Sequence, residues 1–136
     1  MILCLLVVCK FSISQFNTLN CVICRYPVDE PFLNNVRDEV IYQVKRLQSH
    51  ASIVLWSGNN ENEASIAQNW WNLTVEMMPK MKDDYRKLYV DTVRKTLQEI
   101  DKGNNRPFVI SSPSNGLESI KEDYIATNPQ DPLYGK

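Results

Sequence analysis

The polar residues best placed to do chemistry follow directly after a short apolar run. Residues 52–56 read Ser-Ile-Val-Leu-Trp, and after a Ser-Gly pair the chain continues as Asn-Asn-Glu-Asn-Glu at 59–63. An apolar run that is rich in β-branched residues and stops at a glycine is typical of a buried strand. Enzymes with parallel sheets place catalytic side chains just beyond the carboxyl ends of such strands. We therefore expect the functional site within residues 59–63.

Cysteine and histidine offer weaker candidates for chemistry. All four cysteines lie in the first 24 residues, and Cys21 and Cys24 have the spacing of a redox pair or of half a zinc site. The other half of a zinc site is missing, because there is no second C-x-x-C and the single histidine is His50. The cysteines are therefore better interpreted as small buried apolar residues. His50 lies at the end of the predicted strand opposite Glu61, so we expect it to fix the strand's entry.

Predicted helices and strands alternate along the chain on both sides of this stretch. Residues 31–49 carry apolar side chains at helical spacing after a candidate cap at Asp29 or Glu30, which predicts a long helix. Residues 108–112 predict a second buried strand that ends in a polar loop. Alternation of this kind is typical of an α/β fold with a parallel sheet, either a small open domain or a piece of a larger one. The other predicted elements are a short helix starting within 61–71, a break at Pro79, a long helix over 83–102 and a short helix over 117–124.

Composition excludes several classes of partner. The chain has 136 residues, which favours one domain, and a net charge of -1. Lysine and arginine form no run or basic face, so we expect no nucleic acid partner. No apolar run approaches the roughly 20 residues of a membrane span, so we expect no membrane partner.

The stretch 50–63 resembles the acid/base signature of the family 2 glycoside hydrolases. Its wording at 55–63, Leu-Trp-Ser-Gly-Asn-Asn-Glu-Asn-Glu, is most similar to the β-mannosidase branch of lysosomal type. Agreement continues at 106–108, Arg-Pro-Phe, and at 111–116, Ser-Ser-Pro-Ser-Asn-Gly, and covers the chain from about 24 to 135. One departure is Ala51, where the family usually carries proline. This change should alter the loop into the strand and leave the chemistry alone.

The resemblance implies a fold that this chain contains only in part. The family's catalytic domain is a (β/α)8 barrel, and residues 23–136 would supply about strands 3 to 5 with their helices. Residues 1–22 fall outside the family. Residues 1–9 have the length of a signal-peptide apolar region but lack a positive start and a clear cleavage site. We expect residues 1–22 to be a signal-like segment or a product of the gene model, and to be poorly ordered.

The resemblance also implies roles for individual residues. Glu61 corresponds to the general acid/base, Asn60 to the residue that contacts the sugar's 2-hydroxyl, and Trp56 to an interior residue near the sugar. The reaction would be the retaining hydrolysis of terminal β-D-mannose in oligosaccharides, with no cofactor and no metal ion. The nucleophile of the family lies on a later strand, so we expect the missing parts of the full-length enzyme to be needed and the chain alone to be inactive. Glu63 is expected to be an exposed first-turn carboxylate.

Some alternatives stay open at this point. The sugar could be a β-galactoside or a β-glucuronide, as in other members of family 2, or the chain could be a non-catalytic module that binds a sugar or a protein partner. Trp70 and Trp71 fit helix packing better than a sugar platform. The resemblance implies a lysosomal location, in which case the Asn72-x-Thr74 sequon would become relevant.

Overall fold

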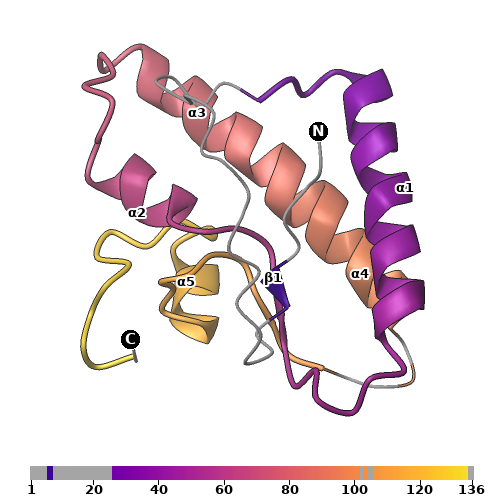
Figure 1. Cartoon of the computed structure of the whole chain (residues 1–136). Helices are drawn as coiled ribbons and strands as arrows, with labels where there is room; N and C mark the ends of the chain where they lie inside the picture. The colour runs from indigo at the N-terminus through magenta and orange to yellow at the C-terminus, as the bar shows by residue number, and fades with distance from the viewer. Residues whose placement is uncertain (1–5, 8–25, 102, 104–105, 135–136) are drawn as a thin grey trace.

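The chain folds into a helix-rich α/β arrangement around one pair of parallel strands (Figure 1). The computed structural model describes residues 6–7, 26–101, 103 and 106–134. The prediction of an α/β fold with parallel strands is confirmed at this level. The elements are β1 (Leu6–Val7), α1 (Glu30–Leu47), β2 (Trp56–Ser57), α2 (Asn62–Ala67), α3 (Met77–Tyr85), η1 (Arg86–Arg94), α4 (Lys95–Ile100), β3 (Phe108–Val109) and α5 (Leu117–Lys121).

Helix α1 forms where the sequence predicts it. Asp29 is the N-cap, and its Oδ1 accepts a hydrogen bond from the Phe32 amide at 3.0 Å. Such a bond satisfies one of the amides that the first turn leaves without a helical partner. The valines at 36, 40 and 44 form the buried stripe, and the helix ends at Leu47, two residues earlier than predicted.

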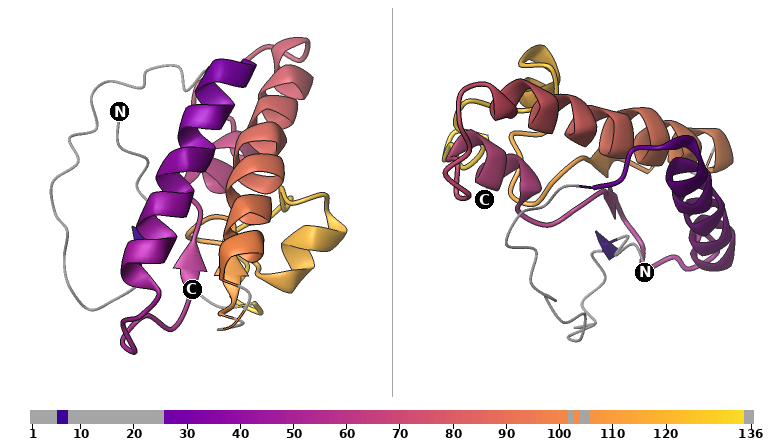
Figure 2. Two further views of the ribbon diagram at one scale, coloured as in Figure 1. Left: turned by 90° about the vertical axis from the view of Figure 1, so that its right-hand side faces the viewer. Right: turned by 90° about the horizontal axis from the view of Figure 1, so that it is seen from above.

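The second long helix is longer than predicted. Elements α3, η1 and α4 follow one another from Met77 to Ile100 without interruption, with wider π-helical turns in the middle. The prediction that Pro79 breaks the chain is wrong, because Pro79 lies in the first turn of α3, where the missing amide hydrogen costs no helical bond. Figure 2 shows α1 alongside this rod, and α1 contacts both η1 and α4.

The sheet is built from very short strands. Trp56 pairs with Phe108 and Ser57 with Val109 in parallel register. Both strands are shorter than the predicted runs of 52–56 and 108–112. The first is delayed because the amide of Ile53 closes a turn on the carbonyl of His50 at 3.1 Å. Parallel pairing resumes further on as a single bridge between residues 60 and 112.

The other edge of β2 is covered by β1. These two strands run antiparallel, with Leu6 opposite Ser57. In a (β/α)8 barrel every strand is parallel to both neighbours, so β1 does not take the place of a barrel strand. Residues 1–5 and 8–25, which include the four cysteines, lie outside the described residues, and the predictions made for them stay predictions. In the part of the chain that the structure describes, no helix has the length and apolar character to cross a membrane.

Candidate active site

Glu61 lies immediately beyond the parallel pairing of the two strands. Its amide donates to the carbonyl of Ser112 at 2.9 Å, and its carbonyl accepts from the amide of Ser65 at 2.8 Å. It is the N-cap of α2 and has a left-handed backbone, with φ 60° and ψ -2°. The residue is exposed, and its side chain makes no capping hydrogen bond to α2. The structure therefore presents this carboxylate to solvent from a backbone that is fixed on both sides.

Asn60 is exposed beside Glu61 and forms the parallel bridge with Ser112. The loop after β3 thus meets the loop after β2 at these two residues. The structure brings the two polar exits predicted from the sequence to the same place, as expected for neighbouring parallel strands.

Asn59, for which the sequence predicts no individual role, holds this loop together. Its side chain is buried, and its Nδ2 donates to the carbonyl of Ile110 at 2.7 Å. Its Oδ1 accepts from the hydroxyl of Ser111 at 2.8 Å and from the amide of Asn62 at 3.2 Å. One side chain therefore ties the end of β2 to the end of β3 and to the start of α2. Its place directly after the Ser-Gly pair that ends the predicted strand is the sequence signal that could have identified it.

Asn62 makes the next set of contacts. Its Oδ1 accepts from the hydroxyl of Tyr26 at 2.7 Å, and its Nδ2 donates to the hydroxyl of Tyr89 at 3.3 Å. The two tyrosine rings meet edge to face, with centroids 5.5 Å apart. The first residue of α2 is thereby bonded to η1 and to the segment before α1, a role that spacing in the sequence does not reveal.

The expectation that Glu63 is an exposed carboxylate is wrong. Its residue is 0% exposed, and its Oε1 accepts from the hydroxyl of Ser119 and from the amide of Ala126, both at 2.9 Å. Burial raises the pKa of this carboxyl above its ordinary value, and the hydrogen bonds from Ala126 and Ser119 oppose that shift. The two glutamates of the motif therefore have opposite environments.

Trp56 is a core residue at the start of β2. It is 0% exposed, and its Nε1 donates to Oδ2 of Asp101 at 2.8 Å. The other carboxylate oxygen of Asp101 accepts from Arg106 at 3.0 Å, and this guanidinium lies 5.8 Å from the centre of the tryptophan ring. Arg106 also donates to two backbone carbonyls. The structure does not bring Trp56 into contact with Glu61, and its sugar contact stays a prediction.

The two adjacent tryptophans in the loop after α2 differ in burial. Trp71 packs against the hydrophobic core, as expected, whereas Trp70 is 49% exposed and donates through Nε1 to Gln68 at 2.7 Å. The same loop carries Asn72 and Thr74, both exposed, and Asn72 has a φ of 50°. The sequon is thus on the surface.

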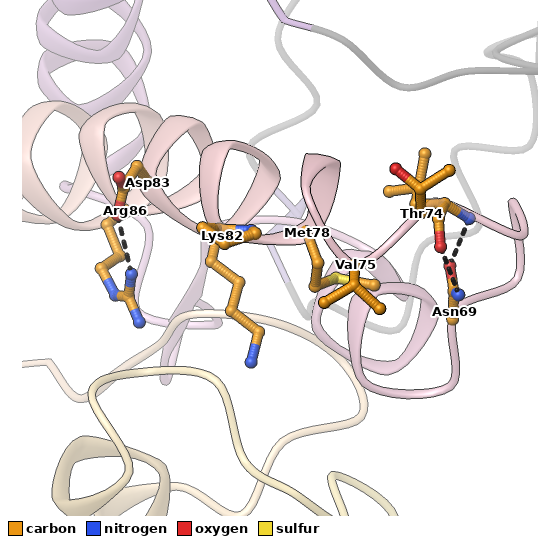
Figure 3. Close-up of a pocket in the computed structure, with 9 residues that line it drawn as sticks. Asn69, Thr74, Val75, Met78, Lys82, Asp83 and Arg86 are labelled. Atoms are coloured by element: carbon orange, nitrogen blue, oxygen red, sulfur yellow. Dashed lines mark hydrogen bonds and ion pairs between the residues drawn. The ribbon is translucent and has the colours of Figure 1, made fainter.

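A cavity of about 480 Å³ lies between this loop and α3 (Figure 3). Asn69 closes the loop by bonding both the amide and the carbonyl of Leu73. Lys82 extends from α3 on the same side, and the salt bridge between Arg86 and Asp83 lies at the far end. None of the predicted site residues lines this cavity. Within the described ranges, no group of three or more histidine, cysteine, aspartate or glutamate side chains could hold a metal ion.

Comparison with known proteins places this geometry in context. No protein-family model matches the chain. The β-mannosidase of Mus musculus is 46% identical over 110 residues, which are 81% of this chain and 12% of the mouse protein. The probable β-mannosidase of Caenorhabditis elegans is 39% identical over the same shares. β-Mannosidase A of Emericella nidulans is 35% identical over 79% of this chain and 10% of its own length. The chain therefore spans about an eighth of the length of the first relatives it matches.

Proposed function

The chain is a β-mannosidase homologue over 81% of its length, and from this premise we propose that it forms part of a retaining β-mannosidase in which Glu61 is the general acid/base. The observation that supports this role most directly is the position of Glu61. It is an exposed carboxylate on a fixed backbone, immediately past the parallel pairing of β2 and β3. Catalytic residues occupy this position in enzymes built on parallel strands.

The proposed reaction is a double displacement on terminal β-D-mannose. Glu61 would protonate the oxygen of the departing sugar and then, as a carboxylate, accept a proton from the attacking water. Asn60, exposed next to it, would contact the 2-hydroxyl of the mannose. The reaction needs a second carboxylate about 5 Å away as nucleophile. Glu63 does not qualify, because it is fully buried and bonded to Ser119 and Ala126.

The nucleophile would therefore come from the remaining length of a β-mannosidase, of which this chain matches about an eighth. We propose that residues 23–136 correspond to about strands 3 to 5 of a (β/α)8 barrel, with β2 and β3 as neighbouring barrel strands. Two observations support this assignment: β2 and β3 pair in parallel, and the helical rod connects them along the chain. Residues 1–22 would not belong to the barrel, in keeping with the antiparallel direction of β1. Trp56 would shape the barrel interior below the sugar.

The substrates would be oligosaccharides that end in β-linked mannose, such as those released from N-glycans, and no cofactor would be needed. We propose a lysosomal location, since the motif at 55–63 is most similar to the lysosomal branch. The exposed sequon at Asn72 supports passage through the secretory pathway. Expression in animal cells should then give a product whose mass falls after endoglycosidase treatment, and Asn72→Gln should remove that change.

A chimera tests the catalytic role of Glu61 in a complete enzyme. The 110 aligned residues of the mouse β-mannosidase would be replaced by those of this chain. We expect the chimera to hydrolyse aryl β-mannosides. Glu61→Gln should lower the rate on a poor leaving group by about 100-fold or more, and far less on a dinitrophenyl leaving group, which needs little protonation.

The same chimera separates the alternatives. Preference for an aryl β-galactoside or β-glucuronide would assign another family 2 specificity. A chimera that hydrolyses β-mannosides equally well with Glu61→Gln would refute the acid/base role. The isolated 136-residue chain should show no turnover, and saturable mannose binding without turnover in the complete chimera would instead favour a non-catalytic module.

A further inference from the structure

Glu63 is a buried carboxyl that the proposed reaction does not use. It follows Glu61 by two positions and lies in the first turn of α2. Its Oε1 accepts from Ser119 in α5 and from the amide of Ala126, which are 56 and 63 residues further along the chain. One carboxyl oxygen therefore joins the start of α2 to the C-terminal part of the described fold. We call these two hydrogen bonds the Glu63 clamp.

The surroundings of Glu63 favour the neutral acid. The titratable groups that face it from the packed elements are Tyr85 in α3 and Glu122 at the end of α5, and neither is a cation. Its Oε2 is buried without a hydrogen-bond partner among the described residues. A buried, unpaired carboxylate is costly, whereas a neutral acid is tolerated. Burial accordingly raises the pKa of Glu63.

Glu61 lies between two fixed points. Before it, the buried side chain of Asn59 bonds to Ile110 and Ser111. After it, the Glu63 clamp holds the first turn of α2. Glu61 itself has a φ of 60°, a left-handed conformation that costs a residue with a side chain roughly 1 kcal/mol and persists only where the surroundings enforce it. The hydrogen bonds of Asn59 and Glu63 flank this conformation on both sides.

We propose that Glu63, through the two hydrogen bonds of its clamp, is a positioning residue that fixes the backbone and hence the carboxylate of Glu61. Substitution by alanine or by glutamine distinguishes the hydrogen bonds of Glu63 from its charge. Glu63→Ala removes the clamp, whereas Glu63→Gln keeps one acceptor oxygen and imitates the neutral acid. The functional half of the inference rests on the proposed role of Glu61, but the structural half does not.

Amide hydrogen exchange on the whole chain tests the structural half without any activity. Glu63→Ala should speed exchange of the Glu61 amide, which is bonded to Ser112, by about tenfold or more through local opening. Glu63→Gln should leave this rate within about threefold of the parent at acid pH. Thr92→Val is the matched control, since it removes a different buried hydrogen bond, to the carbonyl of Lys87. Unchanged exchange at Glu61 in Glu63→Ala would overturn the clamp.

Kinetics in the mouse chimera test the functional half. Glu63→Ala should lower kcat on a poor leaving group by about 100-fold while KM changes little, because a displaced catalytic group still allows binding. Glu63→Gln should keep the kcat of the parent, and its kcat should persist to a higher pH, because the glutamine side chain cannot ionise. Thr92→Val should leave kcat unchanged. If Glu63→Ala does not fold, Ser119→Ala removes one of the two clamp bonds and should lower kcat by about tenfold.

The outcomes separate the two proposals. Loss of kcat in Glu63→Ala together with faster exchange at Glu61 supports the positioning role. Faster exchange with an unchanged kcat overturns it. An active chimera that is insensitive to Glu61→Gln refutes the proposed function alone, because the exchange experiment still decides whether the clamp fixes Glu61.

Discussion

Arg106→Ala should destabilise the fold more than any substitution at the surface. The guanidinium donates to the carbonyls of Ile53 and Gln48 at 2.8 and 2.6 Å and to Asp101 at 3.0 Å. The side chains of Arg106 and Asp101 are only 11% and 3% exposed. The substitution therefore leaves a buried carboxylate whose other oxygen is bonded to Trp56.

The magnitude follows from this burial. Removing one partner of a buried ion pair typically costs about 3–5 kcal/mol, because the remaining charge keeps its desolvation penalty. The total stability of a domain is about 5–15 kcal/mol, so Arg106→Ala should remove a large share of it. With an m-value of about 1–3 kcal/mol/M in urea, the unfolding midpoint should fall by more than about 1 M. Lys95→Ala is the control, since its pair with Asp91 is 59% and 52% exposed and should contribute less than about 1 kcal/mol.

Urea unfolding of the parent, Arg106→Met, Asp101→Leu and the double variant measures the coupling. We expect the double variant to lose about 1–3 kcal/mol less unfolding free energy than the two single variants lose in sum. The reason is that removing both charges also removes the desolvation cost of keeping one of them buried. Additive single effects would refute the reasoning, as would a loss below about 1 kcal/mol for Arg106→Ala.

Three further substitutions probe the strands and the loop. Gly58→Ala would place a Cβ 2.7 Å from the carbonyl oxygen of Ile110, so the free energy of unfolding should fall by about 1–3 kcal/mol, whereas Gly103→Ala meets nothing within 4 Å and should leave the melting temperature nearly unchanged. Asn59→Ala should lower the unfolding free energy by about 1–3 kcal/mol in denaturant titrations, because it leaves buried groups unpaired. Glu63→Gln should become more stable relative to the parent as the pH rises above 4.5. The fold favours the protonated carboxyl of Glu63. The contribution of this group to the free energy of unfolding is therefore complete below its ordinary pKa, and it is lost as the pH rises through the raised pKa of the folded state. A stability difference that does not change with pH would contradict this.

Helix α1 and the parallel pair were predictable because local rules determine them. Asp29 caps α1 and the valines at 36, 40 and 44 form its stripe, as the sequence indicates. The two apolar runs that stop at polar loops correctly predict neighbouring parallel strands. The strand boundaries were not predicted, because the apolar run gives no sign of the local turn from Ile53 to His50, and because the bridge at residue 60 depends on a segment about 50 residues further along the chain.

The continuous helical rod and the partners of the buried polar groups could not be predicted from local sequence patterns. A proline usually predicts the end of a helix, but Pro79 lies in the first turn of α3, where a proline is tolerated. Nothing in the spacing of residues 86–94 distinguishes wider π-helical turns from α-helix. The bonds of Asn59 and Glu63 reach residues 51 to 63 positions away. The sequence can predict that these side chains are polar, but their partners depend on the tertiary fold.

Where helix α2 begins accounts for the contrast between the two glutamates at 61 and 63. Glu61 is the N-cap and has a left-handed backbone, with a φ of 60°, so its side chain does not follow the helical repeat. Glu63 lies in the first turn and is buried together with Ala64, Ser65 and Ile66. The first turns of α2 are therefore packed into the fold, whereas the residue that caps them is exposed. The burial of Glu63 within α2 is thus the structural counterpart of the exposure of Glu61 at its cap.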